Sequence, residues 1–504
     1  MKLADLLDQH PHRLVQGTLD IEIPAGVTAD TRRVERGSLF VAIAGRRQDG
    51  HALLQEAFDK GAVAALVSDS EFSAPGEMTV VRVPDTLAAA SHVAARHQGE
   101  PGRSMQVVSI TGTNGKTSVA AMLESILASL SPAPVGVIGT GGPRIDQAPL
   151  PLSVSTPTTP QAIELQAILR AMADRHAGTV VMEASSLALF QHRVDHAFTD
   201  IGVFTNLSPD HLDDHGSMDA YRQAKMLLFS GLADRAVANA DDPVTAEIYT
   251  LMPGRVTTFG IEQDADYRAT DIQISPAGTA FTLRHQDREH RASVPVPGRF
   301  AVSNALAAIA VCQLLGYELD GILPALAALG QIPGRMQTLR LSRGTTVIVD
   351  YAHSPDSLEK VLDTLRDLAV DGRLITVFGC GGDRDPGKRA PMGAIAGRLS
   401  DHVIITSDNP RTEDPDSILD AIEQGLSSTS TTYDRLTDRR EAIARALLVA
   451  RPGDTVLIAG KGSEDYQIIG ERTTPFQDIA VVHELTADPV PVASSPASKA
   501  TETS

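Results

Sequence analysis

The chain has 504 residues, more than one hydrophobic core usually supports, so two to four domains are expected. Hydrophobic residues make up 42% and charged residues 21%, an ordinary globular mixture that excludes collagen-like, coiled-coil and wholly disordered chains. The formal net charge of −19 argues against binding along a nucleic-acid backbone, so an anionic ligand must be met by specific residues.

The sequence predicts a cytoplasmic protein. Asp5 and Asp8 stand where a signal peptide needs an unbroken apolar stretch, and no later segment reaches about 18 apolar residues. The two cysteines, Cys312 and Cys380, are far apart and do not indicate a disulfide framework. The stretch 488–504 is polar and rich in proline and serine, and is predicted to be disordered.

Apolar runs separated by helical stretches predict an α/β protein of three domains. In residues 1–98, short runs such as SLFVAIAG and MTVVRVP indicate a small α/β domain. Residues 99–332 alternate strands and helices, as in QVVSIT, TVVMEAS and DIGVFTN, which predicts a mainly parallel, buried sheet. Residues 333–487 carry the runs TTVIVDYA, LITVFGC, HVIITSD and DTVLIAG, separated by helical segments as in a Rossmann-like fold. Ligands of such sheets bind beyond the carboxyl ends of the strands, so chemistry is expected in the loops after these runs.

The stretch SITGTNGKTS, residues 109–118, follows an apolar strand and opens a helix. The backbone N–H groups of such a glycine loop, the helix N-terminus and Lys116 together form a cradle for a polyphosphate, with Thr117 positioned for Mg²⁺. The spacing is shorter than the full Walker form, because Ile110 stands where its first glycine would be. We expect nucleotide binding here rather than a merely structural turn.

Three later residues predict a second metal site near the γ-phosphate. Glu183 and His211 each lie just past an apolar strand, where an oxygen and an imidazole could converge on Mg²⁺. The ammonium of Lys225 would repel a metal, but carbamylation by CO₂ would convert it into an anionic oxygen ligand. Taken singly, these residues are better explained as a capping acid, a surface histidine and a solvated helix charge. Their combination with the phosphate loop favours the metal site.

Twelve ordered motifs resemble those of the Mur ligases, the ATP-dependent amide-forming enzymes of peptidoglycan precursor synthesis. The motifs are TGTNGKTS, MEASS, QHRV, FTNLSPDHLDDHG, AK at 224–225, NADD, GRFAVSNALAA, PGRM, VDYAHSPDSLE, FGCGGDRDPGKR, DNPRTEDP and AGKGSEDYQ. The resemblance covers nearly the whole chain and is closest to the members that add meso-diaminopimelate to UDP-N-acetylmuramoyl-L-alanyl-D-glutamate. It implies a monomer with Mg²⁺ as cofactor, and neither a nucleic acid nor a membrane is expected as a partner.

The resemblance implies roles for individual positions. The residues for ATP are Gly112, Thr113, Asn114, Gly115, Lys116, Thr117, Ser118, Asn304, Arg335 and Asp350. The catalytic residues are Lys116, Glu183, His211 and Lys225, and the metal ligands are Thr117, Glu183, His211 and carbamylated Lys225. The residues for the UDP-sugar peptide are Ala29, Thr31, Arg46, Arg47, Gln48, Thr158, Thr159, Ser185, Gln191 and Arg193. The residues for meso-diaminopimelate are Arg389, Asp408, Asn409, Pro410, Arg411, Gly460 and Glu464.

Arg411 is the residue on which the choice of amino acid depends. Meso-diaminopimelate differs from lysine by a second carboxylate at its far end, which a guanidinium can bind with two parallel hydrogen bonds. The acidic Asp408 and Glu464 would suit the ammonium groups of the substrate. The alternative is a surface arginine paired with Glu413.

The implied reaction phosphorylates the γ-carboxylate of D-glutamate and lets the amine of the amino acid attack the acyl phosphate. The alternatives are a lysine-adding member, a ligase similar to folylpolyglutamate synthetase, and a nucleotide-binding regulatory relative without catalysis. Two departures from the family pattern, Leu187 and Ser463 in place of histidines, are the only hints of the last alternative.

Overall fold

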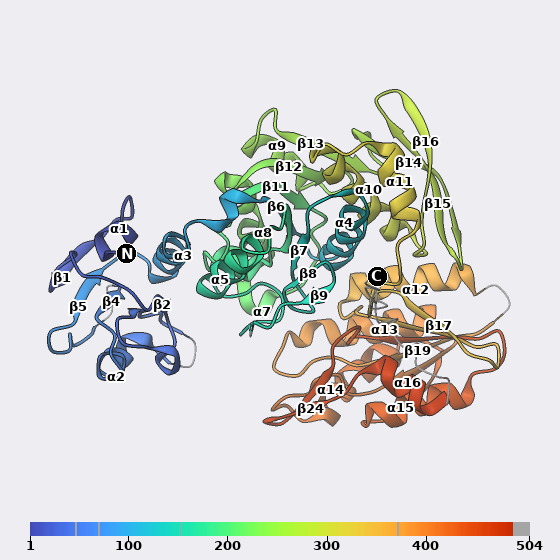
Figure 1. Ribbon diagram of the computed structural model, residues 1–504. Coiled ribbons are helices and arrows are strands. Elements are labelled where there is room, and N and C mark those ends of the chain that lie inside the picture. The colour runs from blue at the N-terminus through green and yellow to red at the C-terminus, as the bar shows by residue number, and fades with distance from the viewer. Residues whose placement is uncertain (46–47, 69–70, 153, 370–371, 487–504) are drawn as a thin grey trace, which may run out of the picture. The chain divides into compact units, whose positions relative to one another are not determined.

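The computed structural model describes residues 1–45, 48–68, 71–152, 154–369 and 372–486 (Figure 1). Contacts divide the chain into two compact units. Unit 1 contains Met1–Gln273, Thr279–Pro295 and Phe300–Leu329, and unit 2 contains Ile274–Gly278, Val296–Arg299 and the chain from Gly330 onward. This division does not test the predicted boundaries at residues 98 and 332, which stay predictions. The predicted disordered stretch 488–504 lies outside the described residues.

A small parallel sheet opens unit 1. Its strands, in the order β1-β5-β4-β3-β2, are parallel except for β1, which runs antiparallel to β5. The strands are β1 Arg13–Gln16, β2 Val27–Thr28, β3 Leu39–Val41, β4 Ala64–Val67 and β5 Thr79–Arg82. The helices are α1 Leu3–Leu6, η1 Thr31–Arg33, η2 Gly50–Leu53, α2 Leu54–Asp59 and α3 Thr86–His97. Strands β3 and β4 are buried along their whole length, which explains their unbroken apolar sequences.

A larger mixed sheet follows in unit 1, in the order β16-β15-β14-β13-β12-β11-β6-β10-β7-β8-β9. Its centre, from β13 to β7, is parallel, as predicted. Its strands are β6 Gln106–Thr111, β7 Val135–Ile138, β8 Arg144–Ile145, β9 Ala148–Pro149, β10 Thr179–Glu183, β11 Thr199–Phe204, β12 Ala233–Asn239, β13 Val256–Gly260, β14 Tyr267–Ser275, β15 Gly278–His285 and β16 Arg288–Val294. The antiparallel pairs β7–β8, β8–β9 and β15–β16 extend the sheet at its two edges.

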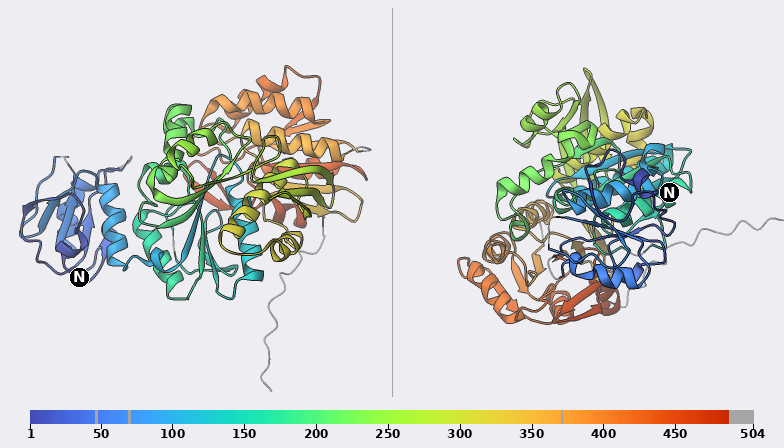
Figure 2. Two further views of the ribbon diagram at one scale, coloured as in Figure 1. Left: turned by 90° about the horizontal axis from the view of Figure 1, so that it is seen from above. Right: turned by 90° about the vertical axis from the view of Figure 1, so that its left-hand side faces the viewer.

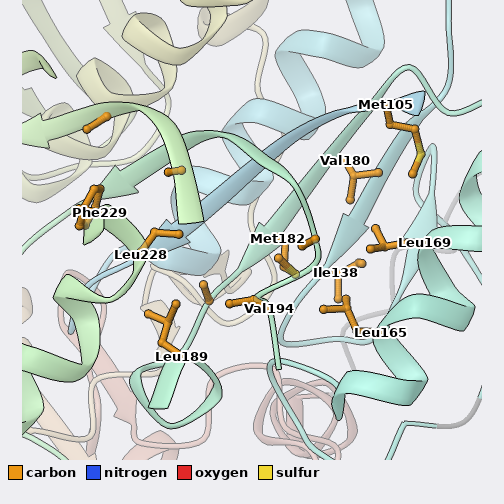
Figure 3. Packing of buried hydrophobic residues seen from close by; sticks show 14 of the residues in the cluster. Met105, Ile138, Leu165, Leu169, Val180, Met182, Leu189, Val194, Leu228 and Phe229 are labelled. Atoms are coloured by element: carbon orange, nitrogen blue, oxygen red, sulfur yellow. The ribbon is translucent and has the colours of Figure 1, made fainter. Parts of the chain in front are cut away.

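Helices flank this sheet in the chain order that the alternating pattern predicts. They are η3 Pro101–Ser104, α4 Lys116–Leu130, α5 Ala162–Ala173, α6 Ser186–Phe190, α7 Leu212–His215, α8 Met218–Met226, η4 Leu228–Leu232, α9 Thr245–Leu251, α10 Arg299–Leu314 and α11 Leu319–Ala327. Figure 3 shows part of the core, where Val180 and Met182 of β10 lie near Leu165 and Leu169 of α5. Burying each such side chain contributes roughly 1.5–3 kcal/mol, so the strands form a firm base for the loops at their carboxyl ends.

Unit 2 contains a six-stranded sheet in the order β17-β18-β22-β19-β20-β21, parallel except for β17. Its strands are β17 Gln337–Arg340, β18 Thr346–Asp350, β19 Leu374–Phe378, β20 His402–Ile405, β21 Thr432–Arg435 and β22 Thr455–Ala459. Strands β23 Tyr466–Ile469 and β24 Arg472–Pro475 form a separate hairpin. The helices, coloured orange to red in Figure 2, are α12 Pro355–Leu368, η5 Pro386–Lys388, α13 Arg389–Leu399, α14 Pro415–Leu426, α15 Arg439–Val449 and α16 Asp478–Thr486.

Both units therefore have the α/β architecture that the apolar runs predict. A buried ion pair between Arg439 and Asp478 joins α15 to α16 in unit 2, with Nη2 to Oδ2 at 2.7 Å and both side chains 0% exposed. In the described part of the chain, none of the helices combines the length and apolar character that a membrane span requires.

Candidate active site

The phosphate loop lies between β6 and α4, and its glycines are required by close approaches. Gly115, at φ +91°, directly precedes α4, and a Cβ there would lie 2.4 Å from Oδ1 of Asn304 on α10. Gly112, at φ +147°, would place a Cβ 1.9 Å from Oγ1 of Thr205. Both positions therefore need glycine, because any side chain would clash and the left-handed backbone would be strained. Asn304, predicted to contact the nucleotide, lies against this loop.

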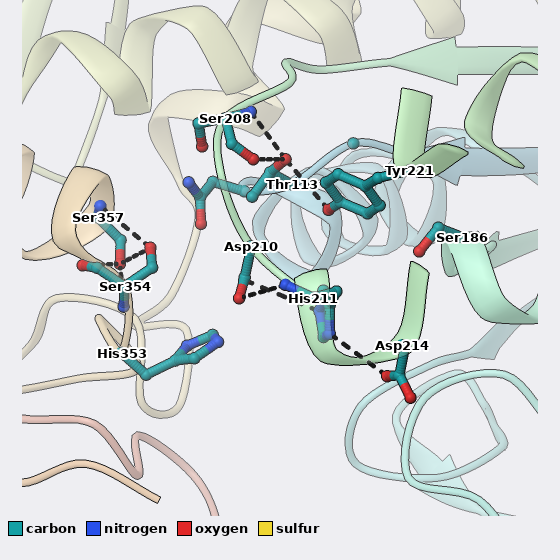
Figure 4. A network of polar contacts seen from close by, with 12 residues as sticks. Thr113, Ser186, Ser208, Asp210, His211, Asp214, Tyr221, His353, Ser354 and Ser357 are labelled. Carbon is teal, nitrogen blue, oxygen red and sulfur yellow. Dashed lines mark hydrogen bonds and ion pairs between the residues drawn. The ribbon is translucent and has the colours of Figure 1, made fainter. Parts of the chain in front are cut away.

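The segment after β11 holds the phosphate loop in place. The Thr113 amide donates to the Asn206 carbonyl at 2.9 Å, and the Asn114 amide donates to Asn206 Oδ1 at 3.0 Å. The Asn114 carbonyl accepts from Thr205 Oγ1 at 2.6 Å. Thr113 Oγ1 also lies 3.2 Å from the Tyr221 hydroxyl (Figure 4). Sequence reasoning missed Tyr221, whose only signal is its place four residues before Lys225 on helix α8.

Lys116 and Lys225 share one acceptor. Nζ of Lys116 donates to the carbonyls of Gly112 at 2.8 Å and Thr113 at 2.9 Å, and Nζ of Lys225 donates to the same Gly112 carbonyl at 2.9 Å. Lys225 is 1% exposed, and its Nζ lies 4.3 Å from the centre of the Tyr221 ring. Burial, and secondly the charge of Lys116, lower the pKa of Lys225 well below its usual value. The neutral amine is the form that reacts with CO₂.

Glu183 ends strand β10 and lies beside Thr117. Its Oε2 accepts from Thr117 Oγ1 at 2.9 Å, and its Oε1 accepts from the Thr140 amide at 2.9 Å. The Glu183 residue is only 2% exposed. The structure thus brings two of the predicted metal ligands together, both with hard oxygen donors. Thr140, which orients Glu183, lies 43 residues away in sequence and has no motif that could have revealed it.

His211 precedes helix α7, at φ +54°, with a half-exposed side chain. Its Nε2 lies 3.8 Å from Asp210 Oδ2 and its Nδ1 lies 4.0 Å from Asp214 Oδ2 (Figure 4). Ligand atoms of His211, Asp213 and Asp214 lie within 4.8 Å of one another. Exposed acids often gather without a metal, so this arrangement alone does not indicate a site. The convergence of His211 on Glu183 and Lys225 stays a prediction.

Residues predicted for the UDP end lie in the segments that follow strands β2 and β3 of unit 1. Thr31 begins η1 and is 8% exposed, just after the partly buried Ala29. Gln48 is exposed, and its carbonyl accepts from the Gly45 amide at 3.0 Å. The predicted contacts Arg46 and Arg47 lie outside the described residues.

The residues predicted for the peptide end gather beside Glu183. Thr159 Oγ1 donates to the Glu183 carbonyl at 2.8 Å and accepts from the Ser185 amide at 3.1 Å. Arg193 donates from Nη1 to the Thr159 carbonyl at 2.9 Å and from Nε to Gln191 Oε1 at 3.0 Å. Burial lowers the pKa of Arg193 to about 10, so it remains a cation at neutral pH. A further hydroxyl contact, 3.3 Å long, links Thr158 to Thr140.

Two predicted nucleotide residues lie in unit 2. Asp350 ends β18, and its carboxylate accepts from the amides of Met336 at 2.7 Å and Ala352 at 2.8 Å. Burial raises the pKa of Asp350, and the nearby Arg335 opposes this shift. The Arg335 guanidinium lies over the Tyr351 ring, 4.3 Å from its centre. Contact of Asp350 with a ribose stays a prediction.

Arg411 is held by main-chain groups. Its Nη1 donates to the carbonyls of Gly382 at 2.8 Å and Asn409 at 3.3 Å. Its backbone, at φ +53°, is linked to the hairpin β23–β24 by two hydrogen bonds. The Arg411 amide donates to the Ile468 carbonyl at 3.1 Å, and the Gly470 amide donates to the Arg411 carbonyl at 2.6 Å. Within the described residues, Arg411 forms no ion pair with a carboxylate. The alternative of a pair with Glu413 is therefore wrong.

Glu413 is instead the partner of Arg389. Nη1 and Nη2 of Arg389 donate to the two oxygens of Glu413, both at 2.7 Å, and Arg389 is 4% exposed. This pair raises the pKa of Arg389 and lowers that of Glu413. Arg389 Nε is buried without a hydrogen-bond partner in the described chain, and contact of Arg389 with a substrate stays a prediction.

The remaining predicted amino-acid contacts lie in the loops after β20 and β22. Asp408 is 9% exposed, and a Cβ at Gly460, where φ is +116°, would lie 2.7 Å from Asp408 Oδ2. The next residue, Asn409, donates from Nδ2 to Glu464 Oε2 at 3.0 Å. The Pro410 carbonyl packs so closely on Gly382 that a Cβ there would lie 1.9 Å from it. The structure thus joins the predicted residues of these two loops.

Comparison with known proteins was made for domains and for whole chains. Residues 24–98 match the catalytic domain of the Mur ligase family, residues 110–312 the Mur ligase middle domain, and residues 334–462 the Mur ligase glutamate ligase domain. The chain is 40% identical to UDP-N-acetylmuramoyl-L-alanyl-D-glutamate–2,6-diaminopimelate ligase 2 of Clostridium acetobutylicum, over 96% of this chain and 100% of that protein.

Two further relatives are also similar over nearly the whole chain. The chain is 42% identical to the UDP-N-acetylmuramoyl-L-alanyl-D-glutamate–2,6-diaminopimelate ligase of Bacillus velezensis, over 95% of this chain and 98% of that protein. A solved structure of a ligase with the same name is 32% identical, with a TM-score of 0.67 over 97% of this chain and 99% of the other. The similarity therefore covers both units from end to end.

Proposed function

Because the chain belongs to the Mur ligase family, we propose that it joins meso-diaminopimelate to the γ-carboxylate of D-glutamate in UDP-N-acetylmuramoyl-L-alanyl-D-glutamate. This is the reaction in the names of its full-length relatives. ATP is the co-substrate, and the product is a precursor of peptidoglycan. The substrates are small and water-soluble, which suits an enzyme of the cytoplasm.

The observation that carries this proposal is the environment of Arg411. The guanidinium of Arg411 is held by carbonyl oxygens and forms no ion pair with a carboxylate of the described chain. Its side-chain hydrogen bonds within the described chain use Nη1 alone, so Nε and Nη2 are available as a fork for a carboxylate. Meso-diaminopimelate offers such a group at its far end and lysine does not. Arg411 is therefore the residue that selects between the two amino acids.

The residues of the phosphate loop suit phosphoryl transfer from ATP to the substrate carboxylate. The loop amides and the ammonium of Lys116 bind the phosphate oxygens and oppose the charge that builds up on them. The γ-carboxylate of D-glutamate attacks the γ-phosphorus, the bond to ADP breaks, and an acyl phosphate forms. The uncharged amine of the amino acid then attacks the acyl carbon, loses a proton and expels inorganic phosphate.

The donors near the loop fit Mg²⁺, which would neutralise phosphate charge during the transfer. The hydroxyl of Thr117 and the carboxylate of Glu183, 2.9 Å apart, are the hard oxygen ligands that this ion prefers. His211 offers an imidazole nitrogen as a further ligand. Lys225 fits the site only after its buried amine has become a carbamate. We propose that this modification is present in the active enzyme.

The residues proposed for the phosphate loop and the peptide belong to unit 1, and those proposed for the amino acid belong to unit 2. Holding the amine close to the acyl phosphate can supply about 7–11 kcal/mol of the barrier. Water must be excluded before the first step, because it hydrolyses acyl phosphates.

A comparison of two amino acids tests the proposed function. The protein is supplied with ATP, the UDP-linked dipeptide and radiolabelled meso-diaminopimelate or lysine. We expect label from meso-diaminopimelate to enter the UDP-linked product, with phosphate release that requires both the dipeptide and the amino acid. Equal incorporation of lysine would contradict the assignment of Arg411. Phosphate release independent of both substrates would contradict a ligase.

A further inference from the structure

A buried lysine that the proposed reaction does not yet use lies behind the amino-acid loops. Lys461 follows Gly460 in the loop after β22, and its side chain is 0% exposed. Its Nζ donates to Glu464 Oε2 at 2.9 Å and to Asn409 Oδ1 at 3.3 Å. Asn409 Nδ2 donates to the same Glu464 oxygen at 3.0 Å. The three side chains therefore form a closed triangle of hydrogen bonds.

This triangle joins two loops that the sheet does not join directly. Asn409 belongs to the loop after β20, and Lys461 and Glu464 belong to the loop after β22, while β19 lies between these strands. The hairpin continues the link, because the Ile468 amide donates to Asn409 Oδ1 at 2.9 Å. Arg411, two residues after Asn409, in turn donates its amide to the Ile468 carbonyl. The position of Arg411 therefore depends on contacts that pass through Asn409.

The triangle also orients the Glu464 carboxylate. Oε2 accepts hydrogen bonds from both Lys461 and Asn409, whereas the described chain supplies no hydrogen bond to Oε1. The side chain of Glu464 is 19% exposed, so it is not sealed off from a ligand. Fixing one oxygen of a carboxylate leaves the other in a defined place, where it can accept from an ammonium group.

We propose that Lys461 is a positioning residue for the amino acid: it fixes Glu464 and Asn409 so that an acceptor for the substrate ammonium and the guanidinium of Arg411 keep their places. The inference rests on the proposed function and extends it to a residue that contacts no substrate. A fully buried ammonium needs such partners, because an unpaired charge in the interior is strongly unfavourable. Lys461 thus links the recognition of the two ends of the amino acid.

Replacement of Lys461 by methionine, which has a similar shape and no charge, tests this role. We expect Lys461→Met to raise the KM for meso-diaminopimelate about tenfold or more, because hydrogen bonds to a charged group are lost. The KM values for ATP and the UDP-linked dipeptide should stay within about twofold of the wild type. The double variant with Glu464→Gln should be little worse than the more impaired single variant, since the two residues act together.

The matched control is Lys360→Met on α12. Lys360 also pairs with an acid, Asp356, but its side chain is 50% exposed, so this variant should leave all three KM values unchanged. If Lys461→Met is recovered unfolded, Lys461→Gln, which keeps a donor, carries the same measurement. Failure of both variants to fold would show that Lys461 serves the fold alone and would overturn the proposal.

Two other outcomes would overturn it. An unchanged KM for meso-diaminopimelate in a folded Lys461→Met variant would show that the triangle does not position the site. A lower KM would show that Lys461 merely weakens the attraction of Glu464 for an ammonium. A wild-type protein that does not add meso-diaminopimelate would refute the proposed function itself, whereas the outcomes above concern Lys461 alone.

Discussion

At the scale of single residues, neighbouring groups decide what each arginine can do. Arg389 begins helix α13 and Arg411 lies in the loop after β20, yet Arg389 pairs with the two oxygens of Glu413 whereas Arg411 is held by carbonyls. The first pair is electrically complete, which suits a structural support. The second arginine retains a net charge, which suits binding of an anion.

Replacing Arg411 should therefore affect one substrate. We expect Arg411→Ala to raise the KM for meso-diaminopimelate about 100-fold, because a bidentate charged contact is lost. The KM for ATP should remain close to the wild-type value. Steady-state kinetics check this, with Arg398→Ala as control, since Arg398 is an exposed arginine paired with Glu359. Normal addition of diaminopimelate by Arg411→Ala would show that the loop has been assigned wrongly.

The buried amine of Lys225 leads to a second prediction. Its lowered pKa increases the share of the neutral amine, and that form attacks CO₂. With ¹³C-labelled bicarbonate, the wild-type protein should give a carbamate resonance that Lys225→Met lacks. The exposed lysine variant Lys360→Met should keep the resonance. A resonance that persists in Lys225→Met would place the modification elsewhere.

At the scale of elements, the turn from β6 into α4 is fixed by what surrounds it. The loop has Asn304 on one side and the segment after β11 on the other. Its glycines are therefore required by these tertiary contacts as well as by their own φ angles. This packing gives the loop amides one arrangement before any phosphate binds. Preorganised donors of this kind avoid the cost of ordering the loop during binding.

Gly115→Ala tests how the close contact with Asn304 affects ATP binding. The added Cβ would lie 2.4 Å from Asn304 Oδ1, so the loop or the asparagine must move, and ATP binding should weaken about tenfold or more. Gly254→Ala is the control: its φ of +72° imposes similar backbone strain, but its Cβ would meet nothing within 4 Å. Calorimetric titration with ATP measures both. Equal affinity in the two variants would mean that neither the contact with Asn304 nor the strain at Gly115 matters for ATP binding.

Local signals explain how much of this could be predicted. The helix after the phosphate loop and the polar residues after β10, β11 and β20 follow from glycines and apolar runs that lie close together in sequence. The antiparallel edges of the central sheet were not foreseen, because short strands such as β8 and β9 carry no apolar run.

Partners that are distant in sequence could not be predicted either. Thr140 lies 43 residues from Glu183, and Lys461 lies 52 residues from Asn409. The first pair meets because β10 lies beside β7, and the second because β22 and β20 lie on either side of β19, orders that the chain does not reveal by itself. The pairing of Arg389 with Glu413 was likewise missed, since Arg411 stood nearer to that acid in sequence.

At the scale of the whole molecule, the histidines of unit 1 link stability to pH. His10 stacks on His92 with ring centres 5.0 Å apart, and His92 meets His196 edge-on at 5.1 Å. Burial is the main reason that their pKa values are lowered, for His10 to about 4. Asp8, Asp85, Asp195 and Glu100 partly oppose these shifts, and Asp195 raises the pKa of the nearby His192.

The sign of the effect follows from proton binding. A histidine with a lowered pKa binds its proton more readily when unfolded, so its contribution is present above about pH 6.5 and is lost as the pH falls toward 4. His192 has the opposite sign and offsets part of the change. We expect the Tm of unit 1 to fall between pH 7 and pH 5, by scanning calorimetry.

His10→Phe isolates this contribution. His10 Nε2 is buried without a hydrogen-bond partner in the described chain, so phenylalanine keeps the ring stack and removes only the titration. The variant should lose less stability on acidification than the wild type. The exposed His176 supplies the control His176→Phe, which should behave as the wild type. An identical pH profile for His10→Phe would exclude the ring cluster as the cause.

Arg411 forms no ion pair with an acid of the described chain, and this has an evolutionary consequence. A mutation at this codon therefore strands no buried countercharge. Descendants could exchange one diamino acid for another in their cell walls without first acquiring a compensating change in the scaffold. Natural variation in cross-link chemistry would then start from a position at which the fold is indifferent.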